Sequence, residues 1–441
     1  MALDKVLKFG GAALADGPGV ERCAQLVLRY GGERPVVVVS AHHGVTDLLD
    51  TIARSAADGI LEGDRVRIRH RTILRQLGLD PELLDRHFTE LFSLLAGIKT
   101  RGRIEPRERD LVLSFGERMS ARVVAQTLRK LGALATPVDA FDLGLLSDSN
   151  HGAARPLPES RARVRRAIGE VPGIPVVTGF LAQDRNGNLT TLGRNGSDLT
   201  AALMAEAIGA GELQLWKAVG GIMTADPKIE PEARVVENLG FAEAAEFAFH
   251  GAQVLYGAAL APAQRANVTV RLLDVNDPEA AGTILATTTR GGGLVGIAVR
   301  RRVVRIALEI AVPEERAERT VELFQAFARH GLEPGPIASA AEQLSVYVSE
   351  TAAISALLSD FGARARSTSE LALVALIGRG NGFDDGLAAR ALALCAAEAI
   401  EVVDAFVGTR ATSQVLVVAA TDAERTVRAL HAGLFRQVAL R

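Results

Sequence analysis

The sequence predicts an α/β protein, with a front domain built on a mainly parallel sheet flanked by helices and a rear part holding two small α+β units. Hydrophobic residues make up 48% of the 441 residues but aromatics only 4%, so the core must rest on Ala, Val, Leu and Ile. That composition suits helices packed on a parallel sheet. The chain opens with a strand-helix-strand pattern that has a glycine turn after its first strand. A small-residue run at 287–293 then precedes a different, repeated order of elements.

Periodicity and turn signals place the elements of the front region. Residues 3–9 alternate as in a strand and end at a glycine pair, after which Pro18 favours the start of a helix and Gly31-Gly32 its end. The later patterns predict a buried strand at 35–40, helices within 60–108, a long helix at 109–131, a strand at 175–180, a tight turn at Asn186-Gly187, a polar loop at 190–198, a helix at 199–209 and further elements near 214–217, 240–250 and 269–273.

The rear region repeats one order of elements. Residues 303–361 follow the order strand, helix, two strands and helix, and residues 371–435 return to a similar order. The two sequences resemble each other only weakly, so the order of elements is the evidence for repetition. We therefore divide the chain into a front domain at 1–286, a linker at 287–293 and two α+β units at 294–366 and 367–441.

Charge and hydropathy exclude several classes of partner. The chain has 50 Lys and Arg residues against 52 Asp and Glu, a formal net charge of −2, which provides no global field to attract nucleic acid or an anionic membrane. The N-terminus lacks the apolar stretch of a signal peptide, and no run approaches the roughly 20 apolar residues of a membrane-spanning helix. We expect a cytoplasmic protein that binds neither nucleic acid nor membrane.

Two polar segments follow the first predicted strands, where open parallel sheets place their ligands. Lys8-Phe9-Gly10-Gly11 lets the main chain approach an anion and supplies a cation, although a glycine pair after a strand is more often only a turn. Ser40 offers a hydroxyl at the end of the second strand, where it also suits a plain strand cap. Neither segment is specific by itself.

Residues 190–198 form the most informative segment, because they gather hydroxyls, Arg194 and Asp198 around flexible backbone before a helix. Ser197 or Asp198 alone fits a helix N-cap. Capping does not require Arg194 between two glycines, however. A guanidinium is the group best shaped to hold a carboxylate by two parallel hydrogen bonds.

Other nucleotide, metal and disulfide sites are disfavoured. The sequence has no G-x-x-x-x-G-K-[ST] motif, and the glycines at 378, 380 and 382 do not fit the dinucleotide fingerprint and favour a turn. His42 and His43 are adjacent on an extended segment and point opposite ways, so they are poorly placed to share a metal ion. Cys23 and Cys395 lie in separate apolar helical patterns, which predicts reduced packing residues.

In this order, the segments resemble the aspartokinase branch of the amino acid kinase family, most closely its plant-like monofunctional form. Lys8-Phe9-Gly10-Gly11 is similar to the family's first nucleotide loop, Val39-Ser40-Ala41 to its second, residues 114–120 to its acidic substrate helix and residues 190–198 to its TTLGRGGSD signature. Trp216-Lys217, Gly221-Ile222 and Asp226-Pro227 resemble its nucleotide-binding stretch, and residues 240–255 resemble a later helix. The rear units resemble tandem ACT domains, which sense amino acids.

The resemblance implies the amino acid kinase fold followed by two ferredoxin-like ACT units, and phosphorylation of the L-aspartate side chain by ATP with Mg²⁺ bridging the phosphates. It assigns catalytic roles to Lys8, Ser40 and Asp198, and substrate binding to Thr191, Glu117, Arg194 and Ser197. It assigns nucleotide binding to Gly10, Gly11, Lys217, Gly221, Asp226 and Lys228. No side chain is assigned as a metal ligand. The resemblance also implies a homodimer and an amino-acid effector at the ACT-like units.

Several positions depart from the family pattern. Ala12-Ala13 replace hydroxyl residues, Ala218 and Gly220 replace two aspartates, Tyr256-Gly257 replace His-Pro, and His42-His43 replace small residues. Residues 312–315 and 334–336 depart from the expected effector loop and its next strand, so lysine feedback is not expected. Two other functions therefore stay open: a repurposed amino acid kinase for another carboxylate, and a non-catalytic amino-acid-binding regulatory protein.

Overall fold

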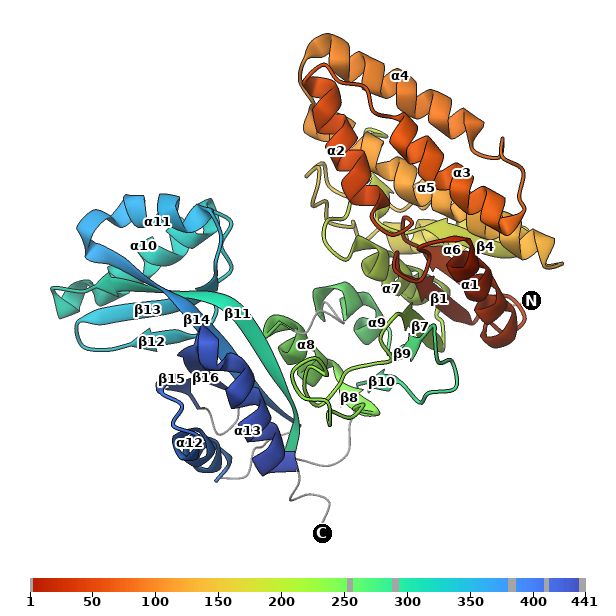
Figure 1. Cartoon of the computed structure of the whole chain (residues 1–441). Helices are drawn as coiled ribbons and strands as arrows, with labels where there is room; N and C mark the ends of the chain where they lie inside the picture. The colour runs from red at the N-terminus through yellow and green to blue at the C-terminus, as the bar shows by residue number, and fades with distance from the viewer. Residues whose placement is uncertain (1–2, 252–256, 288–292, 380–385, 408–411, 436–441) are drawn as a thin grey trace. The chain divides into compact units, whose positions relative to one another are not determined.

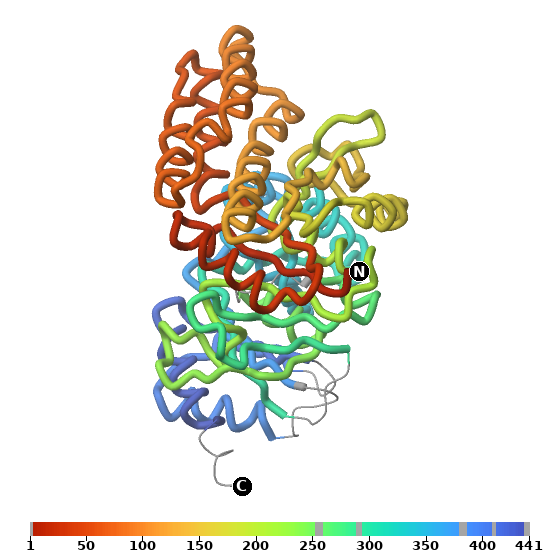
Figure 2. The backbone as a smooth tube through the Cα atoms, turned by 90° about the vertical axis from the view of Figure 1, so that its right-hand side faces the viewer, coloured from red at the N-terminus to blue at the C-terminus, as the bar shows by residue number. Residues whose placement is uncertain are grey.

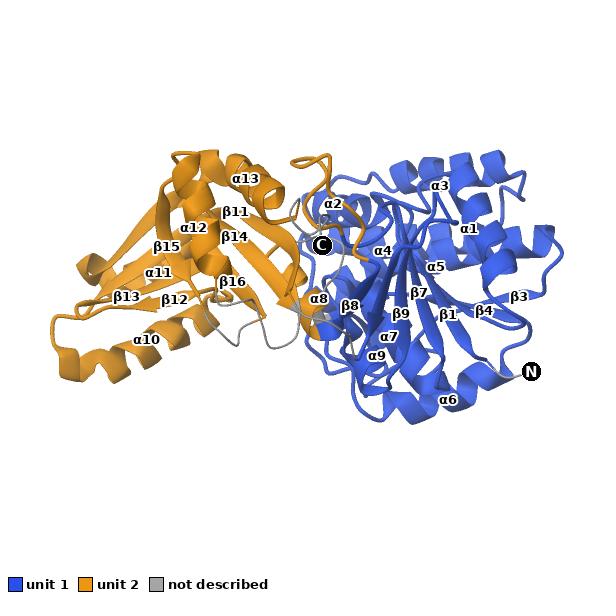
Figure 3. Ribbon diagram, turned by 90° about the horizontal axis from the view of Figure 1, so that it is seen from below, with its two compact units in different colours: residues 1–222, 237–241, 256–287 blue, residues 223–236, 242–255, 288–441 orange. Residues whose placement is uncertain are grey.

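The computed structural model describes residues 3–251, 257–287, 293–379, 386–407 and 412–435. The chain divides into two compact units, coloured separately in Figure 3. Unit 1 comprises residues 1–222, 237–241 and 256–287, and unit 2 comprises residues 223–236, 242–255 and 288–441. Two segments of the sequence-based front domain, 223–236 and 242–255, thus group with unit 2. Tyr256 and most of the expected linker, 288–292, lie outside the described residues.

An eight-stranded sheet forms the centre of unit 1 (Figure 1). Its strands lie in the order β3 (Ala135–Val138), β4 (Ile174–Thr178), β2 (Val36–Val39), β1 (Lys5–Phe9), β7 (Glu212–Lys217), β9 (Thr269–Asp274), β10 (Thr283–Ala286) and β8 (Asn238–Gly240). All neighbours are parallel except β9 and β10. All four residues of β2 are buried, as expected for a strand covered on both faces. The predicted mainly parallel sheet is confirmed.

Helices α2 to α5 pack side by side as one helical layer of unit 1 (Figures 1 and 2). The helices of unit 1 are α1 (Gly17–Tyr30), α2 (Val45–Ala57), α3 (Asp64–Leu77), α4 (Asp85–Arg101), α5 (Pro106–Lys130), α6 (Ser160–Glu170), α7 (Gly196–Ile208), η1 (Gly257–Leu260) and α9 (Ala261–Arg265). Helix α5 begins at Pro106, where a missing N–H is harmless, and a capping box joins Glu105 and Glu108. It therefore starts three residues before the predicted position.

A short hairpin precedes α7. Strands β5 (Leu181–Gln183) and β6 (Leu189–Thr191) are joined through the predicted turn at Asn186-Gly187. The polar loop expected at 190–198 is shorter than predicted, because Thr190 and Thr191 pair with β5 and α7 already begins at Gly196.

The core of unit 1 is aliphatic, with few rings among its buried residues. Phe9 and Trp216 stack with centroids 6.3 Å apart. Cys23 is buried in α1, and Cys395 is buried in α12 of unit 2; both are free thiols, as predicted. Within the described ranges, no helix has the length and apolar character needed to cross a bilayer.

Unit 2 contains a six-stranded antiparallel sheet in the order β12, β13, β11, β14, β16, β15. The elements after residue 292 are β11 (Gly293–Glu309), η2 (Pro313–Glu315), α10 (Arg316–Arg329), β12 (Ile337–Ser339), β13 (Gln343–Ser349), α11 (Ala353–Phe361), η3 (Gly362–Arg364), β14 (Ala365–Arg379), α12 (Leu387–Ala397), β15 (Val402–Phe406), β16 (Ser413–Ala419), η4 (Ala420–Asp422) and α13 (Ala423–Phe435). The order strand, helix, two strands, helix occurs twice, which confirms the predicted pair of ferredoxin-like units. Helix α8 (Phe241–Phe249) lies mostly in unit 2. Gly378 lies in β14, whereas Gly380 and Gly382 fall outside the described residues.

Candidate active site

Unit 1 contains a cavity of about 620 Å³ beside the loops that follow β1 and β2. Loops after parallel strands meet at one edge of the sheet, which is why residues far apart in sequence gather here. The cavity wall includes eight of the residues singled out from the sequence: Lys8, Gly11, Ser40, Glu117, Thr191, Arg194, Ser197 and Asp198. The structure therefore brings together the ammonium, carboxylate and guanidinium groups on which the sequence hypothesis depends.

The loops after β1 and β2 touch each other directly. A Cβ atom at Gly11 would lie 2.9 Å from the carbonyl oxygen of Ala41, closer than real contacts allow. The backbone N–H of Ser40 also donates to the carbonyl of Phe9 at 3.1 Å. Glycine is needed at position 11 because any side chain would push the second loop away from the cavity.

Asp198, in the cavity wall, is a carboxylate that lies between the ammonium groups of Lys8 and Lys217. Asp198 forms an ion pair with Lys8 at 2.6 Å and accepts a hydrogen bond from Lys217 at 3.0 Å. Burial alone would raise the pKa of Asp198, but the two lysines outweigh it and hold the pKa below its usual range. Burial lowers the pKa of Lys8 more than Asp198 raises it. Asp198 therefore stays ionised and fixes both lysines.

Glu117 is brought to the cavity by close packing of α5. A Cβ atom at Gly116 would lie 2.8 Å from the Ala41 side chain, so the helix lies directly against the second loop. Glu117 is 3% exposed, and its Oε2 has no hydrogen-bond partner among the described residues. Burial raises its pKa to about 8, although the backbone N–H of Ala41 and the charge of Lys8 act in the opposite direction. A cationic ligand would satisfy this carboxylate.

Arg194 lies on the segment that leads into α7. Its side chain is exposed and lines the cavity. Asn195 has φ 58°, in the left-handed region, and the chain enters the helix at the next residue. Ser197 and Asp198 thus lie in the first turn, where a helix N-terminus favours anions.

Five of the six predicted nucleotide-binding residues are not in the cavity wall: Gly10, Lys217, Gly221, Asp226 and Lys228. Gly10 borders Lys8, whose Nζ lies 3.6 Å from the position of a Cβ at that glycine. Gly221, at φ 128°, packs against Thr283, which would be 2.6 Å from a Cβ at Gly221. Asp226 and Lys228 are exposed residues of unit 2, and the Asp226 side chain accepts from the backbone N–H of Lys228 at 2.9 Å.

The sequence reasoning missed Phe180 and Arg109, which also line the cavity. Phe180 has φ 67°, which is rare for a bulky residue and marks local strain at the cavity wall. Nothing in the sequence signals that conformation. Arg109 pairs with Asp50 at 2.5 Å and lies eight residues before Glu117 on α5, so helical spacing offered a signal for it.

Similar proteins of known family identify the fold. The family model described as the amino acid kinase family matches residues 5–274. The chain belongs to the amino acid kinase family. Lysine-sensitive aspartokinase 3 of Escherichia coli is 30% identical over 450 residues, covering 98% of this chain and 99% of that protein. Aspartokinase 2 of Arabidopsis thaliana, a chloroplast protein, is 35% identical over 292 residues.

Solved structures agree with this membership of the amino acid kinase family. E. coli aspartokinase III in complex with aspartate and ADP has a TM-score of 0.85 at 29% identity and covers 98% of this chain and 100% of that one. The match to the Arabidopsis relative covers 64% of this chain and 54% of that protein, so the chain spans about half the length of that relative. The predicted amino acid kinase fold with its rear ACT-like units is confirmed.

Proposed function

We propose that this amino acid kinase is an aspartate kinase that transfers the γ-phosphoryl group of ATP to the side-chain carboxylate of L-aspartate, giving 4-phospho-L-aspartate and ADP. One observation carries the proposal: a single cavity presents Glu117, Arg194 and the ion pair of Lys8 with Asp198. A zwitterionic dicarboxylate needs an anion for its ammonium and a guanidinium for its carboxylate, held apart by its own length. The aspartate- and ADP-bound relative from E. coli supports the same assignment.

The charges of the cavity account for the chemistry. Glu117 binds the substrate ammonium, and Arg194 binds the α-carboxylate with Ser197 and Thr191 as hydroxyl donors. The side-chain carboxylate is ionised near neutral pH and needs no base. It forms a bond to the γ-phosphorus while the bond to the bridging oxygen breaks, and ADP leaves with that electron pair. Lys8 stabilises the negative charge that develops on the transferred group, with Ser40 beside it, and Asp198 holds Lys8 and Lys217 in place.

The donor set fits a Mg²⁺ ion carried by the nucleotide. In the part of the chain that the structure describes, no cluster of three or more His, Cys, Asp or Glu residues could hold a metal ion. Mg²⁺ commonly keeps waters and substrate phosphates as ligands instead of a full protein cage. When bound, it would neutralise phosphate charge. The glycines at 10, 11 and 221, with Lys217, Asp226 and Lys228, are proposed to contact the nucleotide.

The direct test is turnover. Purified protein with Mg²⁺ and ATP should release ADP when L-aspartate is present, and the acyl phosphate should be trapped as the hydroxamate with hydroxylamine. D-aspartate and a reaction without amino acid serve as controls. Binding of aspartate without any ADP release would favour the non-catalytic alternative instead.

Arg194→Lys should raise the KM for aspartate roughly 10- to 100-fold while kcat changes less, because lysine keeps the charge but loses the two-bonded contact with a carboxylate. Steady-state kinetics in aspartate at saturating ATP measure this. Arg185→Lys is the matched control, since Arg185 pairs with Glu159 outside the cavity. An unchanged KM in Arg194→Lys would refute the role of Arg194.

The alternative function, an amino acid kinase repurposed for another carboxylate, is motivated by one position. Ala12, which replaces a hydroxyl residue of the family pattern, lines the cavity with a methyl group. A panel of amino and hydroxy acids assayed by ADP release separates the two. Faster turnover of any other carboxylate than of aspartate would replace the first proposal.

Unit 2 is proposed to bind an amino-acid effector and to form a homodimer. The E. coli aspartokinase III structure in complex with lysine and aspartate has a TM-score of 0.80 at 29% identity. Activity measured with and without lysine and threonine tests for an effector, and analytical ultracentrifugation measures the mass in solution. We propose that residues 1–286 form the catalytic domain and residues 287–293 a linker. Residues 294–366 and 367–441 form the two regulatory units.

A further inference from the structure

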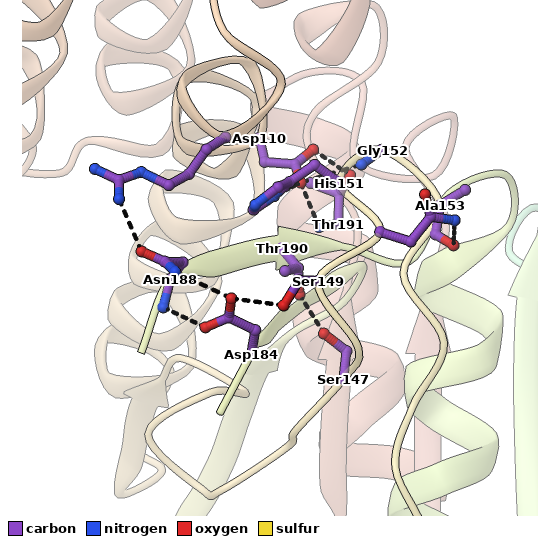
Figure 4. A network of polar contacts seen from close by, with 12 residues as sticks. Asp110, Ser147, Ser149, His151, Gly152, Ala153, Asp184, Asn188, Thr190 and Thr191 are labelled. Carbon is purple, nitrogen blue, oxygen red and sulfur yellow. Dashed lines mark hydrogen bonds and ion pairs between the residues drawn. The ribbon is translucent and has the colours of Figure 1, made fainter. Parts of the chain in front are cut away.

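We propose that Asp110 is a positioning residue that fixes the wall of the substrate cavity; the inference rests on the proposed function. Asp110 is fully buried near the start of α5. Its Oδ1 accepts from the Thr191 hydroxyl at 2.7 Å, and its Oδ2 accepts from the Thr191 N–H at 3.2 Å. Oδ2 also accepts from the Gly152 N–H at 3.1 Å and from His151 Nδ1 at 2.8 Å. Figure 4 shows the carboxylate directed at these three residues.

The hydrogen bonds of Asp110 join three segments that are far apart in sequence. Asp110 lies on α5, Thr191 at the end of β6, and Gly152 in the connection between β3 and α6. Thr191 and Gly152 both line the large cavity. Asp110 does not line that cavity; it borders a smaller one of about 300 Å³, together with His151 and Gly152. Asp110 therefore acts on the substrate through its partners.

The position of Asp110 links the two groups proposed to hold aspartate. Glu117 follows Asp110 by seven residues, two turns along the same helix, and so lies on the same side. Arg194 follows Thr191 by three residues. The carboxylate of Asp110 thus ties the helix that carries the anion to the segment that carries the guanidinium. Their separation sets which dicarboxylate fits.

An amide cannot replace this carboxylate. Asp110 accepts all four hydrogen bonds and donates none. Asparagine has one accepting oxygen, and its NH₂ group would face N–H donors. His151 must carry its proton on Nδ1 to donate, so an asparagine at position 151 can imitate that donor while a leucine cannot.

Asp184 is the matched control in the same network. Its buried side chain accepts from the N–H groups of Asn186 at 2.9 Å and Asn188 at 2.8 Å, and from the Ser149 hydroxyl at 2.9 Å. In Figure 4 it points at Ser149 and Asn188, away from Thr191. None of these partners lines the large cavity. Asp184→Asn should therefore cost stability without altering the site.

The experiment compares full-length Asp110→Asn and Asp184→Asn with the wild type by thermal unfolding, by kinetics in each substrate and by calorimetric titration with aspartate. Asp110→Asn should raise the KM and the Kd for aspartate roughly 10- to 100-fold, as expected when reacting groups are misplaced by about 1 Å, with the KM for ATP within about threefold. Asp184→Asn should lower the unfolding temperature and leave both aspartate constants unchanged. His151→Leu should raise the KM and the Kd for aspartate, but by less than Asp110→Asn does. His151→Asn should keep both constants close to the wild-type values.

The positioning role of Asp110 is wrong if Asp110→Asn and Asp184→Asn change the affinity for aspartate equally. It is also wrong if Asp110→Asn lowers only the unfolding temperature. If Asp110→Asn does not fold, the pair His151→Leu and His151→Asn decides, since no rescue means no role for the network. If the wild-type protein binds aspartate without turnover, the proposed function is wrong, but the Kd for aspartate still tests the role of Asp110. If the wild-type protein neither binds nor phosphorylates aspartate, the proposed function and the role of Asp110 are both wrong.

Discussion

Lys8→Met should lower kcat by roughly 10²- to 10³-fold, the usual effect of removing one preorganised group that stabilises transition-state charge. Lys8 lies at the cavity wall with its Nζ on Asp198. Methionine keeps most of the length and removes the charge. The fold should survive, because Lys217 still pairs with Asp198 at 3.0 Å, so the carboxylate is not left unpaired.

Lys5→Met is the control for this prediction. Lys5 lies on the same strand, three residues earlier, where its Nζ donates to the Tyr30 carbonyl at 3.0 Å and pairs with Glu212 at 3.8 Å. It lies outside the cavity wall, so kcat should change by less than about twofold. Single-turnover phosphoryl transfer at saturating substrates measures both variants. Equal rates for Lys8→Met and wild type would remove Lys8 from the mechanism.

Local chemistry made much of the front domain predictable. The glycine pair after residues 3–9 and the apolar strand at 35–40 marked two loops, and the rule for parallel strands placed Lys8 and Ser40 at one edge. Helical periodicity gave α5 and hence the place of Glu117. These features depend on neighbours in sequence, so the sequence carries them directly.

Long-range partners were not predictable. Asp110 and Thr191 are 81 residues apart in the sequence. No periodic pattern in the sequence indicates that the Asp110 carboxylate binds Thr191. The strand pairing of Thr190 and Thr191 with β5 shortened the polar loop, since pairing satisfies backbone groups that composition assigned to a loop. Residues 223–236 and 242–255 group with unit 2 through contacts that are distant in sequence. The Ile297 N–H, for example, donates to the Thr224 carbonyl.

Aspartate binding should release about one proton per site at about pH 7, because the substrate ammonium ionises a carboxylate that is protonated in the free protein. Glu117 has its pKa raised by burial from near 4.5 to about 8. Below about pH 8 the free site therefore holds a proton, and the bound site does not. The Kd for aspartate should then fall about tenfold per pH unit as pH rises towards 8, and level off above it. Calorimetry in two buffers of different ionisation enthalpy measures the proton directly.

Glu117→Gln supplies both the control and the stability test. Glutamine is nearly isosteric and does not titrate, so its weaker aspartate binding should show no dependence on buffer. A folded pKa of about 8 above an unfolded value near 4.5 means that the neutral carboxyl contributes stability at low pH, which is lost as pH rises through 8. The unfolding temperature of Glu117→Gln relative to wild type should therefore increase between about pH 5 and about pH 9. A constant difference, together with proton-free binding in the wild type, would mean that Glu117 is ionised in the empty site and that the ammonium meets a preformed charge.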